Sequence, residues 1–207
     1  FAVVRRLLRE GSLGAVRFAS YRYARPWTSS AELPWRLQAE HAGGGFFMDI
    51  GCHTIDLFDH LLGPLEDVRG IASNTAGAYD AEDTVALTFR TPSGAIGSMS
   101  WSFVSAPRVD EIEIRCEHGV IRCSCFGDEP VVVARGERTE EHSAPNPPHI
   151  QQPLVQTIVA AVRGEGSCPS TGDSALRTAR AMDAVLESYW GDRSGEFWKR
   201  VTPRRRR

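Results

Sequence analysis

The chain has 207 residues, of which 42% are apolar and 24% are charged, and its formal net charge is −2 at neutral pH. These values are typical of a globular protein with one large or two small domains, and they argue against nucleic acid as the main partner. No apolar run approaches the roughly 20 residues that span a bilayer, and no secretory signal is present. We therefore expect a cytoplasmic protein that binds neither a membrane nor a nucleic acid.

The first part of the chain predicts a helix, a strand, a loop and a second helix. Residues 1–10 place apolar side chains against arginines with the spacing of an amphipathic helix, and residues 15–23 alternate as a strand does. Residues 25–42 are typical of a loop. Residues 46–62 then predict a helix, because glycines precede this segment and a Gly-Pro pair follows it.

The rest of the chain predicts strands and then two helices. Turn signals separate six expected strands, at residues 65–73, 83–90, 95–104, 109–115, 120–125 and 131–135. Because short connections join neighbouring strands as hairpins, we expect residues 65–135 to form one antiparallel sheet. Two helices, at 153–163 and 174–190, are expected to pack with helix 46–62 against one face of this sheet. The arginines at 204–207 are interpreted as a solvated end of the chain.

Five cysteines are present, and none of their spacings is a recognised zinc motif. They are Cys52, Cys116, Cys123, Cys125 and Cys168. Cys123 and Cys125 would face the same side of a strand and could bind a metal together with Cys116 and His118. Buried or half-buried free thiols in a reducing cytoplasm are the preferred interpretation, so no metal ligand is assigned.

Helix 46–62 separates its residues by chemistry. Its apolar side chains fall on one broad arc, and aspartates and histidines at i, i+4, i+7 and i+11 fall in a narrow stripe on the other side. The stripe consists of Asp49, His53, Asp56 and His60. It has three interpretations: a solvated face with Asp–His hydrogen bonds, a metal site, or an acid–base site in which an aspartate orients a proton-accepting histidine.

The stretch around this helix resembles the signature of the glucose–fructose oxidoreductase/inositol dehydrogenase (Gfo/Idh/MocA) family. The signature is Gly-Gly-Gly-x-x-x-Asp-x-Gly-x-His-x-x-Asp, followed by an apolar run and Leu-Gly. Its residues here are Gly43, Gly44, Gly45, Asp49, Gly51, His53, Asp56, Leu62 and Gly63. The resemblance implies an NAD(P)-dependent oxidoreductase acting on a sugar, a polyol or a related secondary alcohol. It implies that Asp49 and His53 are the catalytic pair, with His53 as the proton acceptor.

The resemblance also implies a particular domain organisation. Family members join an N-terminal Rossmann domain, which binds NAD or NADP and supplies a lysine from a Glu-Lys-Pro motif, to a C-terminal domain. That domain is of the α+β class, with a large open, mostly antiparallel sheet and helices packed on one face. Residues 1–207 resemble it as a single domain and contain neither Glu-Lys-Pro nor a Gly-x-Gly-x-x-Gly after a strand. We therefore expect half of an active site, with the cofactor bound mainly by an absent Rossmann domain, and a homo-oligomer formed through the open sheet.

Further substrate contacts are expected next to the helix. Trp35 and Arg36 lie in the loop before the glycines, where an aromatic ring and a guanidinium could bind a carbohydrate-like substrate, although loop packing explains them equally well. Asp56 is a weaker candidate for substrate binding or structural support. Two other functions stay open, a binding or scaffold relative without a cofactor domain and a metal-dependent lyase or isomerase that uses the Asp/His stripe.

Overall fold

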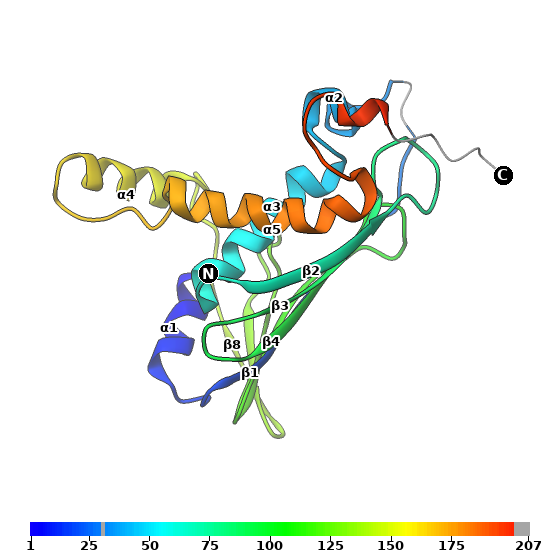
Figure 1. Ribbon diagram of the computed structural model, residues 1–207. Helices are drawn as coiled ribbons and strands as arrows, with labels where there is room; N and C mark the ends of the chain where they lie inside the picture. Colours follow the sequence, from blue (N-terminus) through cyan, green and yellow to red (C-terminus); the bar gives the residue numbers. More distant parts are fainter. Residues whose placement is uncertain (30–31, 201–207) are drawn as a thin grey trace.

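The protein is described here by a computed structural model that covers residues 1–29 and 32–200, so the predicted solvated end at 204–207 lies outside the described residues. One eight-stranded sheet forms the centre of the molecule, with helices on one side of it (Figure 1). The helices are α1 (Ala2–Glu10), α2 (Ala39–Ala42), α3 (Phe46–Leu62), α4 (Gln152–Val162) and α5 (Gly172–Trp190), with short 3-10 turns η1 (Trp35–Leu37) and η2 (Phe197–Lys199). The strands are β1 (Val16–Ala24), β2 (Glu66–Ser73), β3 (Thr84–Arg90), β4 (Ile96–Ser102), β5 (Val109–Cys116), β6 (Gly119–Cys123), β7 (Val131–Arg135) and β8 (Arg138–His142).

The sheet is open and mostly antiparallel, as predicted. Its strand order is β2-β3-β4-β1-β5-β6-β7-β8, and the β1–β4 pair is parallel while the other pairs are antiparallel. Residues 65–135 lie in one sheet, as expected, but their strands are not joined throughout as neighbouring hairpins, because β1 lies between β4 and β5. The segment from β4 to β5 therefore crosses over β1 and is not a hairpin. Alternating apolar and polar residues identify a strand, but they carry no information about which strand lies beside it.

Strand β1 shows how the sequence distinguishes the two faces of the sheet. Ala19, Tyr21 and Tyr23 are buried on the face that the helices cover, whereas Phe18 and Arg22 on the other face are exposed. Side chains alternate between the faces along a strand, so this pattern fixes which face becomes the core. The sheet is thus open on one side.

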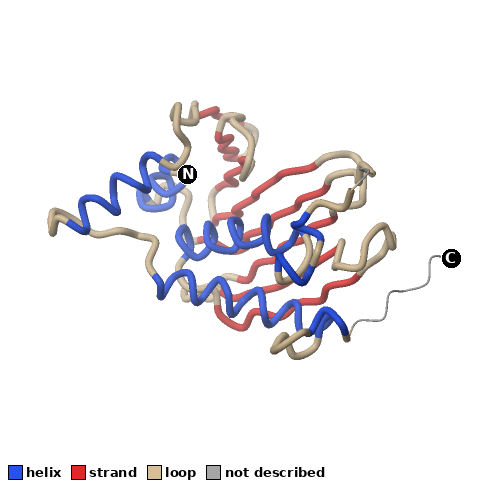
Figure 2. The backbone as a smooth tube through the Cα atoms, turned by 90° about the horizontal axis from the view of Figure 1, so that it is seen from above, coloured by secondary structure: helices blue, strands red, loops and turns tan. Residues whose placement is uncertain are grey.

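Helices α3 and α5 lie across the covered face (Figure 2). Phe47 of α3 packs edge to face against Trp101 of β4, with 4.9 Å between the ring centroids. Val185 of α5 is fully buried. Each buried side chain of this size contributes about 1.5–3 kcal/mol, so apolar packing is the main force that holds both helices on the sheet. An ion pair of 2.6 Å between Arg177 of α5 and Asp59 of α3 fixes their relative position.

Helix α4 does not cover the sheet, so the packing predicted for residues 153–163 is wrong. None of its residues is buried, and its apolar side chains are exposed, from 40% for Leu154 to 84% for Val162. It extends away from the rest of the molecule at the left of Figure 1. The apolar periodicity predicted the helix correctly, but it did not identify a surface for the helix to pack on.

Strand β8 was not expected from the sequence, because Arg138-Thr-Glu-Glu-His lacks apolar residues. It occupies one edge of the sheet, where charged residues are common since they discourage pairing with another chain. Among the described residues, no helix is long and apolar enough to cross a membrane. All five cysteines are free thiols, and each is partly buried.

Candidate functional site

The three glycines before α3 form a tightly packed turn. Gly43 adopts a left-handed conformation with φ of +77°, at the C-terminal end of α2. A Cβ atom on Gly45 would lie 2.5 Å from the backbone oxygen of Glu82, so no larger residue fits there without a shift. Gly51 is restricted in the same way, because its Cβ would lie 2.5 Å from the ring of Phe47. These signature glycines, together with Gly44 beside Met48, therefore serve the packing of α3 against its surroundings.

Glu82, just before β3, anchors this turn. Its side chain is fully buried and accepts hydrogen bonds from the backbone N–H of Gly45 at 2.8 Å and from the indole N–H of Trp190 at 2.9 Å. Burial raises the pKa of Glu82 to about 7, although these hydrogen bonds oppose the shift. Arg193 completes the anchor, since its guanidinium donates to the carbonyl oxygen of Gly43 at 2.6 Å. The N-terminal end of α3 is thus joined to both β3 and α5.

The predicted stripe lies on the solvent side of α3. His53 is exposed, and Asp49, Asp56 and His60 are partly exposed, whereas the opposite side of the helix is buried in the core. The helical spacing thus places all four polar side chains on one face, as the sequence indicated. Among the described residues, no hydrogen bond or ion pair joins Asp49 to His53 or engages the carboxylate of Asp56.

Asp49 pairs with Arg36 instead. The guanidinium Nε of Arg36 lies 3.0 Å from Oδ2 of Asp49, and both side chains are partly exposed. The same guanidinium stacks on the ring of Trp35, 4.6 Å from its centroid. Trp35 is 55% exposed, so more than half of its surface is open to solvent. The structure therefore brings Trp35 and Arg36 to the head of the stripe, and Arg36 holds the Asp49 carboxylate in place.

An aromatic ring that sequence reasoning missed lies beside His53. The ring centroids of His53 and Phe126 are 6.0 Å apart, in an edge-to-face arrangement. Phe126 is placed by Asp110, whose carboxylate accepts hydrogen bonds from the backbone N–H groups of Cys125 and Phe126 at 3.0 Å and 2.7 Å. The hydroxyl of Tyr21 donates to the same carboxylate at 3.0 Å. No local pattern signals this contact, because it joins residues far apart in the sequence.

The two ends of the stripe differ in their surroundings. His60 lines a cavity between α1 and the end of α3, whereas Asp49, His53 and Asp56 line neither this cavity nor the one on the open face of the sheet. The described residues hold no group of three or more His, Cys, Asp or Glu side chains that could bind a metal ion. The arrangement can therefore offer an acid–base pair to a reactant, while a further wall would have to enclose that reactant.

The fold and the motif together define the class of protein. The open, mostly antiparallel sheet and its helix with a glycine-flanked Asp/His stripe have the features that the resemblance implied for a C-terminal oxidoreductase domain. Residues 1–122 match the family model of the GFO/IDH/MocA C-terminal domain, and the chain belongs to this family. The match includes the glycines, the whole of α3 and the strands up to β6.

Individual relatives cover more of the chain. Oxidoreductase P35 of Formosa agariphila is 29% identical over 157 residues, which are 75% of this chain and 47% of that protein. The 1,5-anhydro-D-fructose reductase of Ensifer adhaerens is 26% identical over 159 residues, 74% of this chain and 48% of that protein. This chain thus spans about half the length of these curated relatives. A solved structure of levoglucosan dehydrogenase with NADH and levoglucosan shares the fold, with a TM-score of 0.77, 21% identity and coverage of 90% of this chain and 60% of that one.

Proposed function

We propose that this domain provides the substrate half of an NAD(P)-dependent oxidoreductase that acts on a sugar, a polyol or a related secondary alcohol. One observation carries the proposal: Asp49 and His53 project from the solvent side of a helix whose other side is locked into the core. The names of the relatives, a reductase of an anhydro sugar and a dehydrogenase of levoglucosan, support carbohydrate-like substrates.

In this proposal His53 accepts the hydroxyl proton as the alcohol becomes a ketone. An imidazole can accept a proton near neutral pH, which suits this step. Asp49 favours the imidazolium that forms, through its negative charge one turn away. Arg36 positions Asp49 and, with Trp35, lies where hydroxyl groups and an apolar sugar face would be bound.

The residues of this chain suit the acid–base part of that chemistry but not the binding of a dinucleotide. A pyrophosphate needs free backbone N–H groups at a glycine-rich turn between a strand and a helix. The N–H of Gly45 is already used by Glu82. We therefore place NAD or NADP mainly in a Rossmann domain outside these residues, where the bound nicotinamide would supply the hydride acceptor.

Two measurements test this division of labour. Calorimetric titration of the purified 207-residue chain with NADH and NADPH should give no binding. Measurable affinity would show that these residues bind the cofactor themselves and would contradict its assignment to a Rossmann domain. A complete enzyme that carries these residues together with a Rossmann domain should reduce NAD⁺ or NADP⁺ with at least one member of a panel of anhydro sugars, aldoses and polyols. Turnover that requires a bound metal ion and no nicotinamide would instead support the metal-dependent lyase or isomerase.

We further propose that subunits associate through the open face of the sheet. This face has a shallow concavity of about 710 Å³. Ile71 and Ile96 are 69% and 51% exposed on it, and small residues such as Ser98 leave it flat enough for a second sheet. A homodimer or tetramer would bury these side chains. Sedimentation that shows a monomer at micromolar concentration would contradict this assembly.

The five free thiols support a reducing compartment, and we propose the cytoplasm. Extraction of the protein under conditions that trap disulfides should recover all five thiols in reduced form. A disulfide in the trapped protein would indicate an oxidising compartment.

A further inference from the structure

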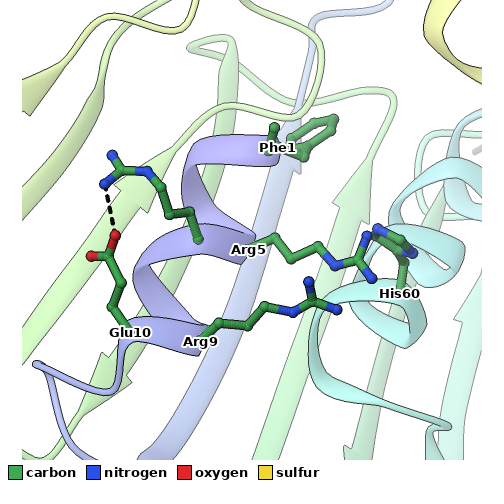
Figure 3. Close-up of a pocket in the computed structure, with 7 residues that line it drawn as sticks. Phe1, Arg5, Arg9, Glu10 and His60 are labelled. Carbon is green, nitrogen blue, oxygen red and sulfur yellow. Dashed lines mark hydrogen bonds and ion pairs between the residues drawn. The ribbon is translucent and has the colours of Figure 1, made fainter.

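A cavity of about 510 Å³ lies between α1 and the C-terminal end of α3, away from Asp49 and His53. Arg5 and Arg9 of α1 line one side of it, and His60 of α3 lines the other. Figure 3 shows the two arginine side chains extending from α1 toward the imidazole of His60. Three nitrogen-bearing side chains from two separate helices thus converge on one space.

The charges around this cavity are not balanced. Arg6, which also lines it, forms an ion pair with Glu10 at 2.8 Å. Within the described part of the chain, neither Arg5 nor Arg9 has a carboxylate within ion-pair distance. These two residues are four apart on a helix, so their guanidinium groups lie on the same face and repel each other. An anion bound between them would relieve this repulsion.

The surroundings of His60 also show that positive charge dominates at this cavity. The pKa of His60 is lowered, first by burial and then by the positive charge of Arg5, with a smaller contribution from Arg9. Asp56 and Asp59 on the same helix oppose this shift but do not reverse it. Asp59 is bound by Arg177 of α5, so it does not neutralise the arginines of α1. The positive charge around the cavity thus disfavours the protonated form of His60.

We propose that Arg5, Arg9 and His60 form a binding site for a phosphate-class oxyanion, either free phosphate or the phosphate group of a small ester. Two guanidinium groups can each donate paired N–H bonds to such an anion. The cavity volume exceeds that of phosphate alone and falls within the range of small-ligand sites. The site stands independently of the redox function, because binding can be measured without turnover.

The position of the site relates it to the Asp/His stripe. His60 follows His53 by seven residues, so the two side chains share one face of α3 and lie about 10 Å apart along its axis. An ester bound through its phosphate at His60 would extend along the helix toward His53. The two possible sources of the anion are therefore a free ion and the remote phosphate of an elongated ligand.

Calorimetric titration of the purified chain with inorganic phosphate and with sulfate at low ionic strength tests the site. Wild-type protein should bind both anions, and Arg5→Gln and Arg9→Gln should each weaken binding about tenfold, since each removes one charge-assisted contact. Arg17→Gln is the control: it removes the same charge from an exposed residue that pairs with Glu117 and does not line the cavity. It should change the affinity less than threefold. Absence of binding, or equal losses in all three variants, would overturn the proposal.

A pH series with sulfate, which does not titrate near neutrality, isolates the role of His60. Sulfate affinity should rise as the pH falls through the range in which His60 gains its proton, because the bound anion favours the imidazolium. His60→Gln should abolish this rise while both arginines keep most of the affinity. A pH dependence that survives in His60→Gln would remove His60 from the site.

Titration with a hexose phosphate and with inorganic phosphate distinguishes the two sources. Tighter binding of the ester would identify a phosphorylated ligand, and equal or weaker binding would identify free anion. In either case Arg5→Gln should weaken binding. If the affinity for the hexose phosphate is the same in Arg5→Gln as in wild type, the proposed site is wrong. Thermal unfolding of each variant should match wild type, because Arg5 and Arg9 contribute no buried contact to the core.

Discussion

The two ends of helix α3 differ in how their polar groups are satisfied. At the N-terminal end, Gly45 is bound by Glu82 and Asp49 by Arg36, so the backbone and the carboxylate are both held in place. At the C-terminal end, His60 faces two arginines that have no carboxylate partner among the described residues. The first end is preorganised, which suits chemistry that depends on fixed geometry. The second end is electrostatically incomplete, which suits the binding of a charged ligand.

The largest expected effect separates the two histidines of the stripe. In a complete enzyme that carries these residues, His53→Ala should lower kcat by roughly 10²–10⁴-fold, the usual contribution of a general base, with the folded state intact because His53 is exposed. His60→Ala, at the other end of the helix, should change kcat far less. Steady-state kinetics of both variants provide the measurement. Equal losses would show that the stripe acts as one unit and would revive the metal-dependent alternative.

The next effect concerns the anchor at the N-terminal end. The pKa of Glu82 is raised to about 7 from an ordinary 4.5, so the folded protein keeps a proton that the unfolded chain loses in this interval. The free energy of unfolding should therefore fall as pH rises from about 4.5 to 7, by on the order of 3 kcal/mol from this group. Glu82→Gln cannot ionise and should lack this decrease in urea unfolding curves. The exposed Glu187→Gln serves as the control and should keep the wild-type slope; parallel curves for wild type and Glu82→Gln would contradict the assignment.

A smaller loss of stability is expected from the glycine turn. Gly45→Ala would place a Cβ atom 2.5 Å from a backbone oxygen, which should lower the free energy of unfolding by about 1–3 kcal/mol. Gly172→Ala is a suitable control, since no atom lies within 4 Å of its added Cβ and its φ is not in the left-handed region. It should leave stability unchanged or slightly raised. Denaturant unfolding compares the two, and a neutral Gly45→Ala would show that the turn can relax.

The smallest effect is expected from Asp49→Asn. It keeps the size of the side chain but removes the charge that favours the imidazolium, so kcat should fall roughly tenfold in a complete enzyme that carries these residues. The effect is limited because no direct hydrogen bond joins Asp49 to His53 among the described residues. The double variant with His53→Ala should be little slower than His53→Ala alone, since the base that Asp49 assists is already gone. Additive losses would mean that Asp49 acts separately, for example on the substrate.

Local patterns predicted most elements, and long-range neighbours account for most of what was missed. Helix 46–62 agrees with α3 at both ends because glycines and a Gly-Pro pair delimit it. The place of β1 within the sheet depended on partners that no local pattern names. Strand β8 was missed because its charged residues lack the usual strand signal, and α4 was misplaced because an apolar face does not specify what covers it.

In the candidate site, too, local patterns predicted some residues, whereas contacts between distant parts of the chain were missed. Helical spacing placed Asp49, His53, Asp56 and His60 on one face, and Trp35 and Arg36 were expected beside it. The contact from Glu82 to Gly45 spans 37 residues and that from Arg193 to Gly43 spans 150, so neither is encoded in a motif. The kinetic variants at Asp49, His53 and His60 test whether the residues of the stripe take part in catalysis.

The position of β1 also has a consequence for how the chain folds. Tyr21 of this early strand pairs with Met99 of β4 and with Ile112 of β5, so the centre of the sheet joins segments that are synthesised far apart. Contacts of such long sequence separation slow folding, because the intervening chain must be ordered before they form. During synthesis β1 has no sheet partner until β4 has emerged. Until then, both edges of β1 are unpaired and open to other chains. Successful production of the domain therefore depends on conditions that protect this strand until residue 112 has been made.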